Sequence, residues 1–161
     1  MRYRFRPLFI AALFFLIAGC AFDASKMDLR DIVRSASPND ALACPPGICR
    51  AQADFETPVF AVGQTRLTDI ARATFKNQPR TELVGGDPAL DQLVFVQRSR
   101  LFGFPDTIRV QGATVGARAS VIIYSRSNYG YWDFGVNRAR VRDWLDMLVR
   151  AVKRDRARNP G

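Results

Sequence analysis

The stretch Ile123–Leu148, IYSRSNYGYWDFGVNRARVRDWLDML, decides the fold of this 161-residue chain. It begins as the end of an apolar strand, passes through a turn rich in glycine and aromatic residues, and ends in an amphipathic helix. The helix is the clearest part, because its large apolar residues recur every three or four positions and therefore share one face. These residues are Val141, Trp144, Leu145, Leu148 and Val152. We predict a helix over residues 137–154 that packs this face on the core.

Two arginines in the first turn of this helix need an anionic partner. Arg138 and Arg140 lie where the partial positive charge of the helix dipole disfavours cations. An internal partner would be Asp133 or Asp106, which would make the pair a strut of the fold. An external partner would be a phosphate, sulfate or carboxylate bound at the helix N-terminus. The internal arrangement is the commoner one. Asn137 is the predicted N-cap residue.

The turn before the helix carries four aromatic residues within residues 128–135. They are Tyr129, Tyr131, Trp132 and Phe134. Aromatic side chains mostly contribute buried area, so we predict that the turn folds under the sheet and covers the core. The alternative is an exposed platform on which a sugar or a base could stack.

Three segments resemble one protein family. The most specific is the motif around Asp133, Gly135, Asn137, Arg138 and Arg140, preceded by Ser125 and Ser127; the others are Ser99–Asp106 and Cys44-Pro45 with Cys49. Together they cover residues 44–153 and resemble the domain of unknown function 1499 family. That family has no established activity, so the resemblance implies a fold and a domain extent. Where the family has paired aspartates this chain has Pro105-Asp106, so a carboxylate-pair site is not implied.

The N-terminus is typical of an exported lipoprotein. Residues 1–19 combine three arginines with an apolar run of eleven residues, Leu8–Ala18, which is too short to span a bilayer but suits a signal peptide. The small residues before Cys20 predict cleavage there and acylation of that cysteine, which would anchor the chain to a membrane. By resemblance to known lipoproteins, Ala21 after the cysteine favours the outer membrane, with the domain facing the periplasm. Residues 20–43 are expected to form the lipidated end and a flexible tether.

The two remaining cysteines predict a disulfide. Cys44 and Cys49 flank a turn-like Pro-Pro-Gly-Ile segment, and an exported chain enters an oxidising compartment. The spacing differs from that of a redox-active pair, and two cysteines without any histidine make a poor metal site.

Residues 44–157 are predicted to form one α+β domain: an antiparallel sheet with two helices packed on one face. Expected strands cover residues 57–62, 82–85, 92–98, 107–111 and 118–125, and a first helix, capped by Thr65, covers residues 65–77. In the strand 107–111, alternation places Ile108 and Val110 inward and Arg109 outward. The final helix over residues 137–154 closes the domain.

The composition restricts the chemistry. The absence of histidine removes serine–histidine, cysteine–histidine and histidine–metal mechanisms. An enzyme would have to use Asp133, Asp106, Ser125 or Ser127, and we expect neither catalytic residues nor a cofactor or a metal.

Charge gives a further indication of partners. Removal of residues 1–19 takes three of the 24 basic residues, which leaves 21 against 15 acidic ones, a net charge of +6. Such a surface suits anionic lipid or another polyanion, whereas nucleic acid is not expected for an exported lipoprotein. The basic tail over residues 150–158 is expected to be a helix end, or alternatively a contact with anionic lipid or glycan.

We therefore expect a non-catalytic binding or scaffold module of the cell envelope, whose partner is an anionic ligand or an envelope protein. Its expected working surface is the turn and helix start around Asp133, Asn137, Arg138 and Arg140. The alternative is a module that binds an anionic small molecule or a lipid head group at the helix N-terminus. An exposed aromatic cluster would favour the first hypothesis.

Overall fold

The computed structural model describes residues 27–159. The predicted signal peptide and the predicted acylation site, Cys20, lie outside these residues. Neither helix within the described range is long and apolar enough to cross a membrane.

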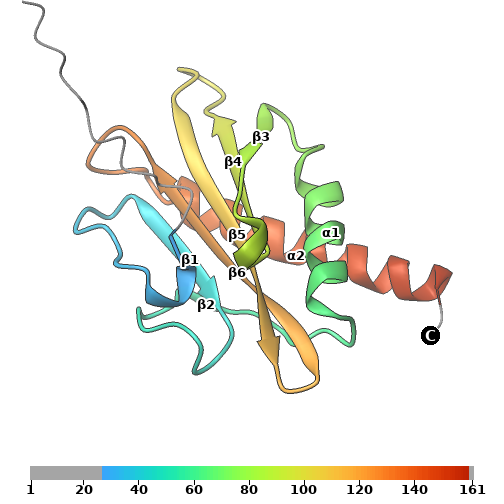
Figure 1. Cartoon of the computed structure of the whole chain (residues 1–161). Coiled ribbons are helices and arrows are strands. Elements are labelled where there is room, and N and C mark those ends of the chain that lie inside the picture. Colours follow the sequence, from blue (N-terminus) through green and yellow to red (C-terminus); the bar gives the residue numbers. More distant parts are fainter. Residues whose placement is uncertain (1–26, 160–161) are drawn as a thin grey trace, which may run out of the picture.

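A six-stranded sheet forms the centre of the domain, with the strand order β2-β1-β6-β5-β4-β3 (Figure 1). All neighbouring strands pair antiparallel except β1 and β2, which are parallel. The fold is therefore α+β, as predicted. The strands are β1 (Asp40–Cys44), β2 (Phe55–Glu56), β3 (Thr81–Gly85), β4 (Gln92–Arg98), β5 (Pro105–Val115) and β6 (Arg118–Ser127).

The two helices, α1 (Gln64–Phe75) and α2 (Val136–Arg158), pack on one face of the sheet. The core between them and the sheet centres on three aromatic rings. Trp144 of α2 stacks on Phe75 of α1 at a centroid distance of 4.4 Å and meets Phe95 of β4 edge-on at 5.5 Å. The apolar face predicted for the last helix is thus the face that closes the core.

The opposite face of the sheet is covered by the N-terminal segment, so the prediction of a tether up to residue 43 is wrong. The short helix η2 (Leu29–Asp31) places Leu29 against Leu42 and Ile122, where it is fully buried. The Leu29 amide also donates to Gln111 Oε1 at 2.8 Å. Strand β1 follows within the same supposed tether and pairs with β6. The domain therefore begins before residue 44.

Three other sequence-based predictions need correction. The strand expected over residues 57–62 is replaced by β2 and by a single bridge between Phe60 and Ala119. Helix α1 begins at Gln64 after Gly63, so Thr65 is not its cap. Arg109 does lie on the face opposite Ile108, but the N-terminal segment covers that face. Arg109 is therefore buried, and burial lowers the pKa of its guanidinium.

The predicted disulfide between Cys44 and Cys49 is present. It closes the loop that follows β1, and Ile48 and Cys49 of that loop pack beside the buried Leu42. The loop thus extends the apolar layer that covers the second face of the sheet.

The buried N-terminal segment can be tested with one substitution. We expect Leu29→Ala to lower the free energy of unfolding by about 2 to 5 kcal/mol, because it removes a buried side chain and leaves a cavity. The matched control is Val33→Ala, four residues later, where the side chain is 88% exposed. Urea unfolding followed by fluorescence measures both. Equal, small effects of the two changes would mean that the segment is a tether after all.

Candidate functional site

The side chain of Arg140 lies at the centre of a buried polar network between α2 and the sheet. Its Nη2 donates to Asp106 Oδ2 of β5 at 2.6 Å, and its Nε donates to Gln97 Oε1 of β4 at 2.5 Å. Its Nη1 donates to Ser125 Oγ of β6 at 2.9 Å and to Asn137 Oδ1 at 2.6 Å. One guanidinium therefore joins the first turn of α2 to three neighbouring strands.

Asn137 extends the network toward the N-terminal part of the chain. Its side chain is fully buried, and its Nδ2 donates to Ser127 Oγ at 2.9 Å, to the Asn39 carbonyl at 2.9 Å and to Asp133 Oδ2 at 2.8 Å. Its Oδ1 accepts from Ser125 Oγ at 2.6 Å. Every polar atom of this amide is thus used inside the protein.

The N-terminus of α2 is capped by Asp133, so the prediction that Asn137 is the N-cap is wrong. The helix begins at Val136 after Gly135, whose φ of +77° few other residues adopt. Asp133 Oδ2 accepts from the Asn137 amide at 2.8 Å, and its Oδ1 accepts from the Gly135 amide at 2.9 Å. A carboxylate of the chain itself thus occupies the place where an external anion would bind.

Arg138 and Arg140 find different partners. Arg140 pairs with Asp106, one of the two internal partners considered from the sequence, and both side chains are buried. Arg138 pairs instead with Asp54 at 2.8 Å, and its guanidinium lies 4.9 Å from the centroid of the Phe55 ring. More than half of the Arg138 side chain is exposed. Sequence reasoning missed Asp54, because it lies in an irregular segment far away in the chain.

Most of the network is closed to solvent. Ser125 is fully buried, and Ser127 and Asp106 are nearly so. Within residues 27–159, the one buried side-chain oxygen or nitrogen without a hydrogen-bond partner is Asn39 Oδ1. The same described residues contain no group of three or more acidic, cysteine or histidine side chains that could hold a metal ion.

Large apolar side chains gather instead on the surface of the two loops that flank this network. The prediction that the aromatic turn folds under the sheet is therefore wrong. These side chains, between 48% and 89% exposed, form what we call the aromatic rim: Leu101, Phe102, Phe104, Tyr129, Tyr131, Trp132, Phe134 and Val136. The inner side of the turn is bound by polar groups, because Asn39 Nδ2 donates to the Gly130 carbonyl and Asn137 Nδ2 donates to Asp133 Oδ2, and the rings are exposed.

The rim is partly ordered by contacts among its own rings. Phe102 stacks on Phe104 at a centroid distance of 5.6 Å, and Phe104 lies 6.2 Å from Tyr129. Trp132 stacks on Phe134 at 6.0 Å. The loop between β4 and β5 and the loop between β6 and α2 lie at the same end of the sheet (Figure 1). The sequence signal for the first loop was its apolar Leu101-Phe102-Gly103-Phe104 run, which no helix or strand pattern accounted for.

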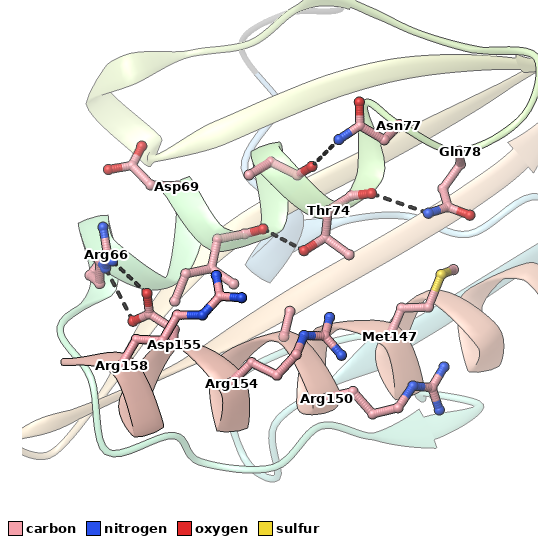
Figure 2. Close-up of a pocket in the computed structure, with 13 residues that line it drawn as sticks. Arg66, Asp69, Thr74, Asn77, Gln78, Met147, Arg150, Arg154, Asp155 and Arg158 are labelled. Atoms are coloured by element: carbon pink, nitrogen blue, oxygen red, sulfur yellow. Dashed lines mark hydrogen bonds and ion pairs between the residues drawn. The ribbon is translucent and has the colours of Figure 1, made fainter. Parts of the chain in front are cut away.

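A polar groove of about 670 Å³ runs between α1 and α2 (Figure 2). Arg150, Arg154 and Arg158 line it from α2 at four-residue intervals, and Figure 2 shows them along one side of the helix. Arg66 of α1 pairs with Asp155 at 2.5 Å across the gap. The basic tail is thus helical as far as Arg158, and its charges face a wide groove that also contains Asp69.

The family model described as "Protein of unknown function (DUF1499)" matches residues 35–148. The chain therefore belongs to this family, as the resemblance predicted. The match begins ahead of residue 44, in agreement with the place of β1 in the sheet. Neither the search of curated proteins nor the search of solved structures gives a match.

A double-mutant cycle tests the role of the buried ion pair. We expect Arg140→Met and Asp106→Asn each to lower the free energy of unfolding by about 3 to 5 kcal/mol, because each leaves an uncompensated buried group. The double variant should lose much less than the sum of the two.

The control for this cycle is Arg138→Met, which removes a largely exposed arginine from the same helix turn. It should cost at most about 1 kcal/mol, since exposed ion pairs contribute little. Chemical unfolding of the wild type and of all four variants measures these free energies. Additive effects of the Arg140 and Asp106 changes would mean that the two residues do not stabilise the fold as a coupled ion pair.

Proposed function

We propose that this DUF1499 protein is a non-catalytic binding module of the bacterial cell envelope, anchored to a membrane through an acylated Cys20, and that the aromatic rim is its binding surface. The observation that supports this most is the exposure of eight large apolar side chains, seven on two adjacent loops and one, Val136, at the start of α2. The proposal places the domain in the periplasm, on the outer membrane.

Leaving the apolar rim exposed to water is energetically unfavourable, and the requirements of folding do not explain it. Complete burial of one such side chain is worth about 1.5 to 3 kcal/mol. Contiguous apolar patches on monomeric proteins mark interaction sites, and tyrosine and tryptophan are enriched in them. The rim has this composition and lies at one end of the domain.

The polar network gives the rim a rigid base. Gln97 and Asp106, which bind Arg140, stand on either side of the loop that carries Phe102 and Phe104. Ser127 and Asn137 stand on either side of the loop that carries Trp132. Loops held in this way lose less conformational entropy on binding than free loops do.

The same network argues against catalysis. The candidates for an enzymatic role, Asp106, Ser125, Ser127 and Asp133, all have hydrogen-bond partners inside the protein. A nucleophile or a general acid needs access to its substrate, which the buried Ser125 and Asp106 lack. The alternative of an anion at the N-terminus of α2 is also weakened, because Asp133 occupies that position.

The disulfide supports the envelope location. Disulfides form and persist in oxidising compartments such as the periplasm and are rare in the cytosol. The Cys44–Cys49 bond belongs to the covering layer of the sheet, which makes it a structural bond.

Lipidation of Cys20 can be tested by metabolic labelling with an alkyne fatty acid. We expect the wild-type chain to be labelled and the Cys20→Ser variant to remain unlabelled. The control is a variant with both Cys44→Ser and Cys49→Ser, which keeps Cys20 and should keep the label. A label that persists in Cys20→Ser would refute the proposed anchor.

The binding surface can be tested by photo-crosslinking in living cells. A photoreactive amino acid replaces Phe102 or Trp132 in the rim of the full chain, or Val33 or Val84 at exposed apolar positions outside it. We expect adducts with lipid or protein from the two rim positions and from neither control, because only the rim is in lasting contact with a partner. Equal yields from all four positions would refute the assignment of the rim.

A further inference from the structure

We propose that the partner of the aromatic rim is the lipid bilayer itself: the rim inserts into the interfacial layer of the membrane in which Cys20 is anchored. This inference rests on the proposed function and names the partner of that same surface. It assigns the domain a fixed orientation, with the rim toward the lipid and the opposite end of the sheet away from it.

The composition of the rim matches the chemistry of a bilayer interface. Tyrosine and tryptophan have an apolar ring and one polar group, and they are enriched where acyl chains meet head groups. Tyr129, Tyr131 and Trp132 have this character. Phe102, Phe104 and Phe134 are wholly apolar and suit the acyl boundary just below. The two loops that carry most of the rim lie at one end of the sheet (Figure 1), an arrangement that fits a soft, extended surface.

Basic side chains flank the rim. Arg100 is part of the first loop, Arg98 precedes it, and Arg126 precedes the second loop, and all three residues are exposed. In the described part of the chain these arginines form no ion pair. Each basic residue close to an anionic membrane surface contributes about 1 kcal/mol to attraction. The exposed arginines and the apolar rim therefore favour the same orientation of the domain, with the rim toward the membrane.

The length of chain between the anchor and the domain allows this contact. The Met27 carbonyl accepts from Gln92 Nε2 at 2.6 Å, which holds the start of the domain beside the first residue of β4. The rim lies beyond the other end of β4, about 20 Å away at the usual rise of a strand. The seven steps from Cys20 to Met27 span at most about 25 Å when fully extended. The rim can thus touch the membrane while Met27 stays in place.

The two tryptophans of the chain provide the test. Trp132 belongs to the rim, whereas Trp144 is buried against Phe75. The full-length lipidated protein is reconstituted into vesicles of phosphatidylethanolamine and phosphatidylglycerol, with or without bromine on the acyl chains. We expect brominated lipid to quench the emission of the wild type strongly. The Trp132→Phe variant, which retains Trp144 and an aromatic rim, should show almost no quenching.

Two further double changes separate the rim from a general effect of anchoring. The double change Phe102→Ser and Phe104→Ser should reduce the quenching of Trp132. The same double change in the Trp132→Phe background, where Trp144 emits alone, should leave the emission unchanged, which shows that the core is intact. The matched double change Val33→Ser and Val84→Ser, at exposed positions outside the rim, should leave the quenching as in the wild type.

Absence of quenching in the wild type, with Trp132 fully accessible to aqueous iodide, would overturn the bilayer inference. If rim crosslinkers then still capture protein in cells, the rim remains a binding surface, and only its assignment to lipid fails. If the rim gives neither quenching nor crosslinks, the proposed function fails as well.

Discussion

The ion pair between Arg140 and Asp106 is the interaction on which the rest of the domain depends. It joins the first turn of α2 to β5, and the remaining nitrogens of Arg140 reach β4 and β6. Two buried charges are tolerated only when they are paired and hydrogen-bonded, and here Gln97, Ser125 and Asn137 complete the shell. The direction in which α2 leaves the sheet is therefore specified by polar geometry, while Trp144 and its neighbours supply the apolar contact.

The same polar cluster explains why the aromatic residues lie outside. A turn above a purely apolar core could have buried its rings, and the sequence suggested this arrangement. Asn137 donates to Ser127 and to Asp133 of the turn, and an aromatic ring placed between them would separate these groups from their partners. The aromatic residues therefore remain at the surface, where they are available to another molecule or to lipid. The buried polar network therefore has two effects: it gives the loops a rigid base, and it leaves the aromatic rim exposed.

Elements whose formation depends on the spacing of nearby apolar residues were predicted correctly from the sequence. The spacing of Val141, Trp144 and Leu148 identified the last helix and its buried face, and the alternation around Ile108 identified β5. The pairing of Arg140 with Asp106 was one of two internal alternatives. The failures involve contacts between distant segments. Strand β1 is short and pairs with β6, so its neighbourhood looked like a tether. The partner of Arg138 lies at Asp54, and the exposure of Trp132 depends on what fills the core.

The pairing of β1 with β6 also bears on when the chain can fold. Strand β1 is among the first parts of the domain to be synthesised, but one of its two neighbours in the sheet, β6, is the last strand, and Arg140 follows later still. Contacts between such distant segments form slowly, because a long loop must close before they stabilise the structure. Until most of the chain is available, the centre of the sheet cannot assemble. That delay would suit the export proposed for this chain, because a polypeptide has to stay extended while it passes through a translocation pore and can fold only on the far side.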